Sequence, residues 1–453
     1  MMRYIGLDVH KHFIEVCITD RKGKILERGK VNCQRDVLLE FATKKLRKHD
    51  RVALEATTNT WAVVDLIRPH VKQVVVGNPM KTRAIAEAKI KTDKVDAEVL
   101  AHLLRCDYLP SVWQPDEPTQ TRRALLTHRN GLMSRRGRHM NRVQSMLARL
   151  MIKPPCKYLW SKTGVAWLEA LELSPVDRLM LDSQLRQITQ VNQELEIVDQ
   201  RLVEIARNDS RVRLLMTLPG VSHVVAVGLL AAIGDIERFC DGNHAASYLG
   251  LVPSTRQSGN KCYHGRITKM GNPHCRWLLT QACQHVSRHP GPLGAFYRRL
   301  VKRKPRQVAI MALARKLVTI AWQMLKQNEP YRYAKPMLMA KKFTDLDLKY
   351  RQEQRRTPSA ARAKAGDGLT AVYDEIGFTD SLSLNQVPDG ERRMLIEKDV
   401  MMFVEELYRP VKKDKSTRSD KCMSRDRPDG LIPAHAFFLS IANRNAEKAS
   451  LDF

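Results

Sequence analysis

The sequence predicts an α/β domain at the N-terminus, followed by a mainly helical remainder. Within residues 1–110, three short apolar segments come first and a helix–strand alternation follows, which is typical of a mixed sheet. From residue 118 onward, apolar residues recur at helical spacing. The 453 residues suffice for two or three domains that each bury a core. We divide the chain into regions 1–117, 118–210, 211–330 and 331–453.

The first region carries five predicted strands. They are RYIGLDV (3–9), HFIEVCITD (12–20), KILERGKV (24–31), RVALEAT (51–57) and QVVVGN (73–78). Helices are predicted at 35–48, at 60–68, and from the last strand through residue 105.

The second region is predicted to hold a basic helix, residues 118–150, and a long helix that begins near Ser174 and Pro175. In the long helix, apolar residues repeat in a heptad pattern that includes one polar position, Gln184. The apolar members are Leu181, Ile188, Leu195 and Leu202, with Val191, Val198 and Ile205 between them. This pattern favours a coiled coil, formed either in a dimer or in a hairpin within one chain. A single amphipathic helix lying on its own domain remains the alternative.

The third region contains the turn Leu218-Pro219-Gly220-Val221 between two helical patterns. Helix–hairpin–helix units have such a turn, which offers backbone N–H groups to a phosphate, but an ordinary helix–helix turn looks the same. In the fourth region, residues 351–368 and 409–430 are polar and predict flexible chain. Residues 391–408 predict an isolated helix, and we assign this region no function.

Positive charge dominates the composition, with a formal net charge of +29 and a pI near 9.9. Residues 118–168 hold eleven Lys and Arg and no acidic residue, and residues 242–328 hold fifteen and none. Such blocks favour contact with a nucleic-acid backbone. The candidate contact residues are Arg122, Arg123, Arg135, Arg136, Arg138, Arg256, Lys261, Arg266 and Lys269.

Other compositional features favour a cytoplasmic protein that does not enter a membrane. The sequence has no run of about 18 apolar residues that could span a bilayer. Its first residues, MMRYIGLDVHK, lack the apolar core of a signal peptide. Nine scattered cysteines argue against a disulfide framework and favour a reducing compartment.

Four acidic residues of the first region stand in apolar surroundings. Asp8 lies within the first strand and Glu55 near the end of the fourth, where a lone acid is usually a hydrogen-bonded structural residue. Asp93 and Asp96 lie three residues apart on the apolar stripe of one predicted helix, where unpaired charge is costly. A sheet with the first strand central can bring all four together. Such a cluster predicts bound Mg²⁺ or Mn²⁺, and two such ions can clamp the oxygens of a phosphodiester.

Three segments, IGLDVHK, LEAT and KTDKVDAEVLAHLL, resemble the DEDD-type transposases of insertion sequences, which are relatives of the Piv DNA invertase. The resemblance continues through LPGVSHVVAVGLLAAIGDIERF and AASYLGLVPSTRQSGNKCYHGRITKMGNPHCRWLL, and covers about residues 3–325. It implies a ribonuclease H-like, RuvC-like fold for the first region and a mainly helical transposase domain in the third. It also implies that Asp8, Glu55, Asp93 and Asp96 form the catalytic, metal-binding tetrad.

The segment STRQSGNK contains a second candidate catalytic residue, Ser258. From the residues alone, a serine in a basic loop with glycine is usually a turn residue. The resemblance implies more, because the family carries its nucleophilic serine in this Ser-Gly motif. A serine needs activation, so the metals of the first region would serve it in a composite site. Ser254 is near but lacks the following glycine.

Zinc is a less favoured interpretation of the Cys and His residues in the third region. Their spacings match no closed zinc pattern; the residues are Cys262, His264, His274, Cys275, Cys283, His285 and His289. His10 and His12, near Asp8, are expected to be structural or close to DNA, and not catalytic.

The resemblance implies a transposase or recombinase that cleaves and exchanges DNA strands of an insertion sequence. It further implies an element-encoded bridge RNA that pairs with donor and target DNA, so that base pairing selects the sequence. We expect a dimer or tetramer working at the bacterial nucleoid. Two alternatives remain: a RuvC-like junction resolvase that uses water as nucleophile, and a non-catalytic nucleic-acid-binding protein.

Overall fold

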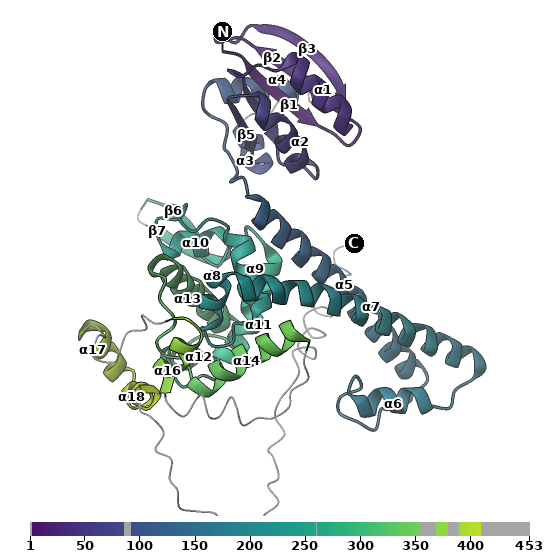
Figure 1. Cartoon of the computed structure of the whole chain (residues 1–453), viewed down its shortest axis with the longest axis vertical. Coiled ribbons are helices and arrows are strands. Elements are labelled where there is room, and N and C mark those ends of the chain that lie inside the picture. Colours follow the sequence, from purple (N-terminus) through teal and green to yellow (C-terminus); the bar gives the residue numbers. More distant parts are fainter. Residues whose placement is uncertain are drawn as a thin grey trace, which may run out of the picture. The chain divides into compact units, whose positions relative to one another are not determined.

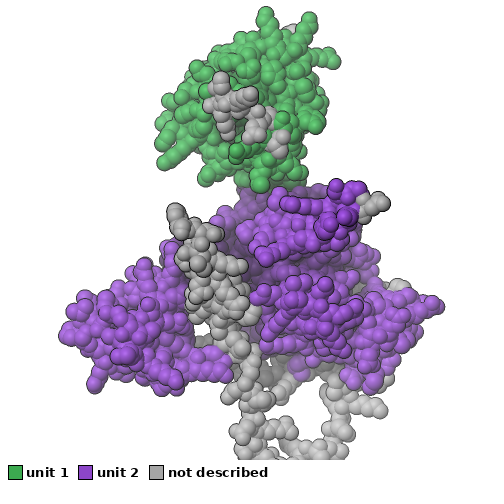
Figure 2. Space-filling model, turned by 180° about the vertical axis from the view of Figure 1, so that it is seen from behind, with its two compact units in different colours: residues 1–116 green, residues 117–453 purple. Residues whose placement is uncertain are grey.

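The computed structural model describes residues 2–85, 92–259, 261–352, 368–378, 387 and 389–408. The chain folds into two compact units, Met1–Asp116 and Glu117–Phe453 (Figure 2). The flexibility predicted for residues 353–367 and 409–430 lies outside the described residues.

A five-stranded mixed sheet forms the centre of the first unit. Its strands are β1 (Tyr4–Val9), β2 (Phe13–Thr19), β3 (Ile25–Asn32), β4 (Arg51–Glu55) and β5 (Gln73–Gly77). The strand order is β3-β2-β1-β4-β5. β1 is therefore central, antiparallel to β2 and parallel to β4, while β4 and β5 are also parallel. The predicted mixed sheet is confirmed.

Helices cover both faces of this sheet (Figure 1). On one face, α1 (Arg35–Lys45) and α2 (Thr60–Ile67) pack on alternate strand residues such as Ile5 and Leu7. On the other face lies α4 (Asp93–Arg105). The short helices η1 (Arg68–His70) and α3 (Pro79–Ile85) complete the unit.

The second unit begins with a long helical hairpin. It is made of α5 (Glu117–Arg149) and α7 (Pro175–Asn208), with α6 (Lys162–Ala170) in the connection (Figure 1). As predicted, Ser174 caps α7, because its hydroxyl accepts the amide of Asp177 at 3.2 Å, and Pro175 follows at the first helical position.

The heptad positions of α7 are buried within one chain. Leu181 packs with Val143 and Leu147 of α5. Leu195 and Leu202 lie in the main core of the unit, which also contains residues of α5 and α9. The hairpin alternative therefore accounts for the heptads, and this seam is not free to form a dimer.

The remaining elements pack around that core. The helices are α8 (Ser210–Met216), α9 (His223–Ile233), α10 (Gly242–Tyr248), α11 (Pro273–Val286), α12 (Pro292–Val301), α13 (Arg306–Gln327), α14 (Pro336–Arg351), α16 (Gly368–Glu375), α17 (Asp389–Glu397) and α18 (Met401–Tyr408). A two-stranded hairpin, β6 (Pro253–Ser258) and β7 (Lys261–Ile267), projects from them (Figure 1).

The turn between α8 and α9 is a packing element. Gly220 adopts a φ of +73°, and a Cβ there would lie 2.4 Å from the carbonyl oxygen of Ala282. The half-buried Lys342 donates hydrogen bonds to the carbonyl oxygens of Met216 and Leu218. These contacts favour an ordinary helix–helix turn over a phosphate-binding one.

Residues 391–408 do not form one isolated helix, so that prediction is wrong. The segment breaks into α17 and α18 around Asp399, which has a φ of 52°. Leu395, Val404 and Leu407 are buried in the main core. Apolar periodicity alone could not reveal the break, because both helices bury the same kind of face.

Within the described residues, one helix, α13, is long and apolar enough by composition to cross a membrane. Its Leu313, Leu317 and Ala321 are fully buried in the main core, and Arg315 and Lys316 interrupt it near the middle. Its apolar character therefore reflects packing inside the unit.

Candidate active site

Two of the predicted acids meet at the carboxyl ends of neighbouring parallel strands. Leu7 of β1 lies opposite Leu54 of β4, so the next residues, Asp8 and Glu55, follow at the same edge. Both side chains are half-buried. The central position of β1 is what makes them neighbours, as the sequence argument required.

Asp8 and Glu55 also lie on the same face of the sheet, the face covered by α4. Ala53, two residues before Glu55, packs with Leu100 and Leu104 of α4. Gly6, two residues before Asp8, touches α4 so closely that a Cβ would lie 1.9 Å from the carbonyl oxygen of Ala97. Because side chains alternate along a strand, residues two apart share a face.

The other two acids belong to the first turn of α4. Thr92 caps this helix, its hydroxyl accepting the amide of Val95 at 3.4 Å. Asp93 is exposed and Asp96 is half-buried. A helix N-terminus favours negative charge, which offsets the repulsion between the two carboxylates. Asp93 and Asp96 lie one turn before Ala97 and Leu100, with which the buried stripe of α4 begins, so the pair extends that stripe toward the helix N-terminus as expected.

His10 joins these acids, although sequence reasoning left it outside the site. Its Nε2 lies 2.9 Å from Oδ2 of Asp8 and 3.5 Å from Oδ1 of Asp93. The three residues offer ligand atoms within 4.8 Å of one another. The sequence did contain one indication for His10, since it lies two residues after Asp8. The chain turns there from β1 into β2, so the His10 side chain stays at the end of β1 that carries Asp8.

The electrostatics of Asp8 favour a bound cation. Burial raises the pKa of its carboxyl group, and the neighbouring Asp96 and Asp93 raise it further, while His10 opposes the shift. A carboxylate with two acidic neighbours is stabilised by a divalent ion with oxygen ligands. The donor set of Asp8, Glu55, Asp93 and Asp96 fits Mg²⁺ or Mn²⁺, because both ions prefer oxygen ligands.

Ser258 lies in the second unit, at the tip of the exposed hairpin. It pairs with Lys261 across the turn, in which Gly259 has a φ of +55°. Arg256 shares its face, because it lies two residues earlier on β6, and Tyr263 lies opposite Arg256. All of these side chains are exposed. The hairpin therefore presents a hydroxyl between positive charges.

The predicted basic residues fall into two groups. Arg122 and Arg123 are used within the chain: Arg122 forms an ion pair with Asp209 at 2.6 Å, and Arg123 donates to the carbonyl oxygen of Ala231 at 2.7 Å. Arg136 is half-buried and donates to Asn192 at 3.2 Å. The exposed residues, available to phosphates, are Arg135, Arg138, Arg256, Lys261, Arg266 and Lys269.

Among the described residues, none of the zinc-type residues singled out in the third region falls in a group of three that could hold a metal ion. Cys275 and Cys283 are buried in the main core, and burial raises the pKa of both thiols to about 12. The eight cysteines that the structure describes are free thiols.

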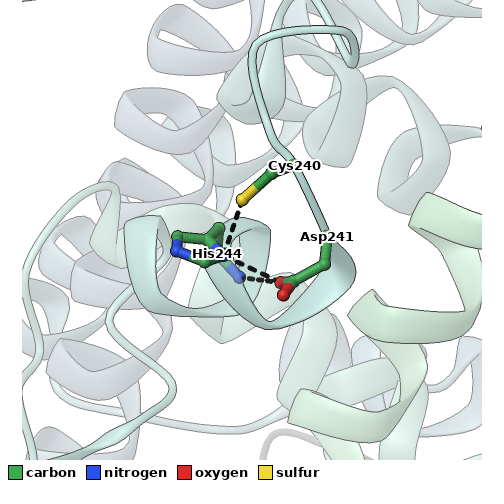
Figure 3. Close-up of side chains that lie close together, drawn as sticks. All are labelled: Cys240, Asp241 and His244. Atoms are coloured by element: carbon green, nitrogen blue, oxygen red, sulfur yellow. Dashed lines mark hydrogen bonds and ion pairs between the residues drawn. The ribbon is translucent and has the colours of Figure 1, made fainter.

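A different Cys–Asp–His group lies at the start of α10 (Figure 3). His244 Nδ1 lies 3.0 Å from Cys240 Sγ and 2.9 Å from Asp241 Oδ1. The same Asp241 oxygen accepts the backbone amide of His244 at 2.8 Å. Asp241 is thus the N-cap of α10, and helix capping explains the arrangement.

Comparisons with known proteins place the chain in a family. Residues 212–298 match the "Transposase IS116/IS110/IS902 family", and residues 5–152 match the DEDD transposases of the IS110 type, described as "Transposase". Together the two matches cover more than half of the chain.

Several curated relatives match over nearly their whole length. The 44.8 kDa protein of insertion element IS116 from Streptomyces clavuligerus is 25% identical, over 74% of this chain and 97% of the relative. The transposase of insertion sequence element IS1111A from Coxiella burnetii is 25% identical, over 73% and 92%. The pilin gene-inverting protein of Moraxella bovis is 27% identical, over 72% and 97%. The chain belongs to the IS116/IS110/IS902 family of transposases, enzymes that cleave DNA and transfer its strands.

Proposed function

We propose that the first unit cleaves DNA with Mg²⁺ or Mn²⁺ held by Asp8, Glu55, Asp93 and Asp96. The observation that carries this proposal is the meeting of Asp8 and Glu55 at one strand edge, on the face where α4 begins with two aspartates. DEDD transposases use a divalent metal, and the raised pKa of Asp8 agrees with a site built for cations. The strand order β3-β2-β1-β4-β5 supports a ribonuclease H-like fold.

Each residue of the site has a defined task in this proposal. When bound, the divalent ions supply Lewis-acid stabilisation of charge on the scissile phosphate. The four carboxylates hold those ions. His10 orients the Asp8 carboxylate through its 2.9 Å hydrogen bond, acting as a positioning residue.

Ser258 is proposed as the nucleophile. Its Oγ forms a bond to phosphorus while the bond from phosphorus to the 3′ oxygen breaks. The serine proton passes to water, and the 3′ oxygen takes up a proton to become a hydroxyl group. Exposed Arg256 and Lys261 favour binding of the phosphate beside Ser258. The proposal thus assigns the metal site to the first unit and the nucleophile to the second.

Partner and assembly follow from the resemblance and the charge. We propose that a bridge RNA encoded by the element pairs with donor and target DNA, and that exposed Arg135, Arg138, Arg266 and Lys269 contact backbones. A dimer or tetramer in the bacterial cytoplasm would coordinate the four cuts of strand exchange. The subdivision of the second unit at residues 210 and 330 belongs to the same proposal.

The tetrad is tested by Asp93→Asn and Asp96→Asn in the full chain. Cleavage of DNA should be lost and Mn²⁺ binding, measured by calorimetry, should weaken, while nucleic-acid binding is kept. Glu98→Gln is the matched control, because Glu98 lies on the same helix but pairs with Arg28 at 2.6 Å. Normal cleavage in both aspartate variants would contradict the assignment.

The nucleophile is tested separately with Ser258→Ala, and with Ser254→Ala as control on the same face of β6. Ser258→Ala should abolish the covalent protein–DNA adduct, whereas Ser254→Ala should keep it. Mass spectrometry of the nuclease-trimmed protein should find the nucleotide remnant on Ser258. Cleavage by Ser258→Ala without any adduct would instead indicate the water-using resolvase.

A further inference from the structure

A pocket of about 430 Å³ in the second unit is lined by residues that belong neither to the acidic tetrad nor to the Ser258 hairpin. Its walls come from α12, α13, the segment 329–333 and α17. It falls in the size range of sites that bind small molecules. The apolar part of the lining is Pro292, Leu293, Phe296, Ile320, Met324 and Met394.

An unsatisfied polar group lies in the wall of this pocket. Tyr331 is only 5% exposed, and its hydroxyl group has no hydrogen-bond partner among the residues that the structure describes. Its ring packs edge-on against Tyr333, with 5.6 Å between the ring centroids. A buried hydroxyl without a partner is costly, so a ligand whose polar edge reached it after a small shift of the pocket wall would be stabilised.

The rim of the pocket has an excess of positive charge. Lys316 and Lys398 both line it, and no ion pair of either is found in the described part of the chain. Burial and the positive charges of Arg299 and Lys316 lower the pKa of Lys398, while nearby Glu397 opposes the shift. These like charges favour a bound anion.

The two acids that line the pocket share one arginine. Arg332 donates to Glu329 at 2.9 Å and to Glu391 at 3.1 Å. Glu391 also accepts the hydroxyl of Tyr333 at 2.5 Å. Three cations, Lys316, Lys398 and Arg332, therefore face two carboxylates, and the lining keeps a net positive charge.

We propose that this pocket binds one unpaired nucleotide of a nucleic-acid strand. The base lies against Phe296 and Tyr331, and its polar edge meets the Tyr331 hydroxyl and the amide of Gln323. The phosphate faces Lys316 and Lys398. Flat bases stack well on aromatic side chains, and lysines bind phosphates, so both halves of a nucleotide are matched.

This inference gives the C-terminal region a task. Glu391, Met394 and Lys398 all belong to residues 389–398, and they form one wall of the pocket. The inference needs only that the transposase handles nucleic acid. It does not depend on the roles proposed for the tetrad or for Ser258.

The test measures how the full chain binds a duplex with one bulged nucleotide and the same duplex without it, each made as DNA and as RNA. The wild type should prefer the bulged form of one of them by about tenfold, as one stacked base contributes. Whether the bulged DNA or the bulged RNA is preferred identifies which nucleic acid supplies the bound nucleotide. Equal binding of paired and bulged duplexes in both forms would overturn the proposal.

The matched variants separate the pocket from general charge. Lys316→Ala/Lys398→Ala should remove the preference for the bulge. Lys302→Ala/Lys304→Ala removes the same charge from exposed residues between α12 and α13 that do not line the pocket, and should weaken both duplexes equally. A kept preference in the first double variant contradicts the proposal.

Tyr331→Phe tests the orphan hydroxyl without removing charge. It should lower the preference for the bulge while leaving the thermal unfolding temperature unchanged or higher, because no protein hydrogen bond is lost. An unchanged preference, or a photo-crosslink from a bulged thiothymidine or thiouridine to residues outside the pocket, would refute the assignment.

Discussion

The contact between Gly6 and α4 makes a strong prediction about the active site. In Gly6→Ala, the new Cβ would lie 1.9 Å from the carbonyl oxygen of Ala97, while ordinary contact begins at 3.4 Å. The helix must therefore shift by about 1.5 Å, or the strand must yield by a comparable amount. Asp96 directly precedes Ala97, so its carboxylate moves away from Asp8. Overpacking of this kind costs about 1–3 kcal/mol of unfolding free energy.

The larger effect should be on catalysis, since a misplacement of ~1 Å can cost ~100-fold in rate. We expect Gly6→Ala to stay folded, to bind Mn²⁺ more weakly in calorimetry, and to cleave DNA about 100-fold more slowly. Gly29→Ala is the control, because Gly29 is also a strand glycine but has no atom within 4 Å of the point that a Cβ would occupy. Wild-type cleavage and metal affinity in Gly6→Ala would refute the idea that this contact sets the position of the aspartates.

Three further predictions concern the second unit. Burial lowers the pKa of Lys342 to about 7 from its usual 10.5. Between these two pH values the lysine is protonated in the unfolded chain but not in the folded one, so the free energy of unfolding rises with pH. Urea unfolding at pH 7.5 and 9.5 should show the free energy of unfolding of the wild type gaining roughly 2–3 kcal/mol relative to that of Lys342→Met. Equal changes in the two proteins would contradict the lowered pKa of Lys342. Arg122→Ala should lower the unfolding temperature because it breaks the pair with Asp209, whereas Arg135→Ala/Arg138→Ala should weaken DNA binding with unchanged stability. Weaker DNA binding in Arg122→Ala and lower stability in Arg135→Ala/Arg138→Ala would contradict these roles. Leu202→Glu should unfold the α5–α7 hairpin, lowering the free energy of unfolding by more than about 3 kcal/mol, because Leu202 is fully buried. If the heptads formed a dimer contact, the variant would instead give folded monomers. Gel filtration with circular dichroism distinguishes the two results.

Local patterns were sufficient to predict much of the first unit. Alternating apolar residues marked the five strands, and parallel neighbours put Asp8 beside Glu55 once β1 was central. The acids stood out because charge in apolar segments is costly. His10 was missed, because its closeness to Asp93 depends on a turn and on a helix that is distant in sequence.

The sequence alone determined which residues are buried or charged, and so the mixed sheet, the heptad seam, the acidic cluster and the basic blocks. Only the tertiary structure decided what those residues meet. A heptad pattern requires an apolar partner without specifying it, and here α5 and the main core fill the seam that a second chain would occupy in a dimer. Likewise, a count of arginines cannot tell that Arg122 is paired with Asp209, 87 residues away, while Arg135 is left exposed. The physical reason is the same in both cases: burial and charge are local properties of a sequence, but their partners are chosen by long-range packing.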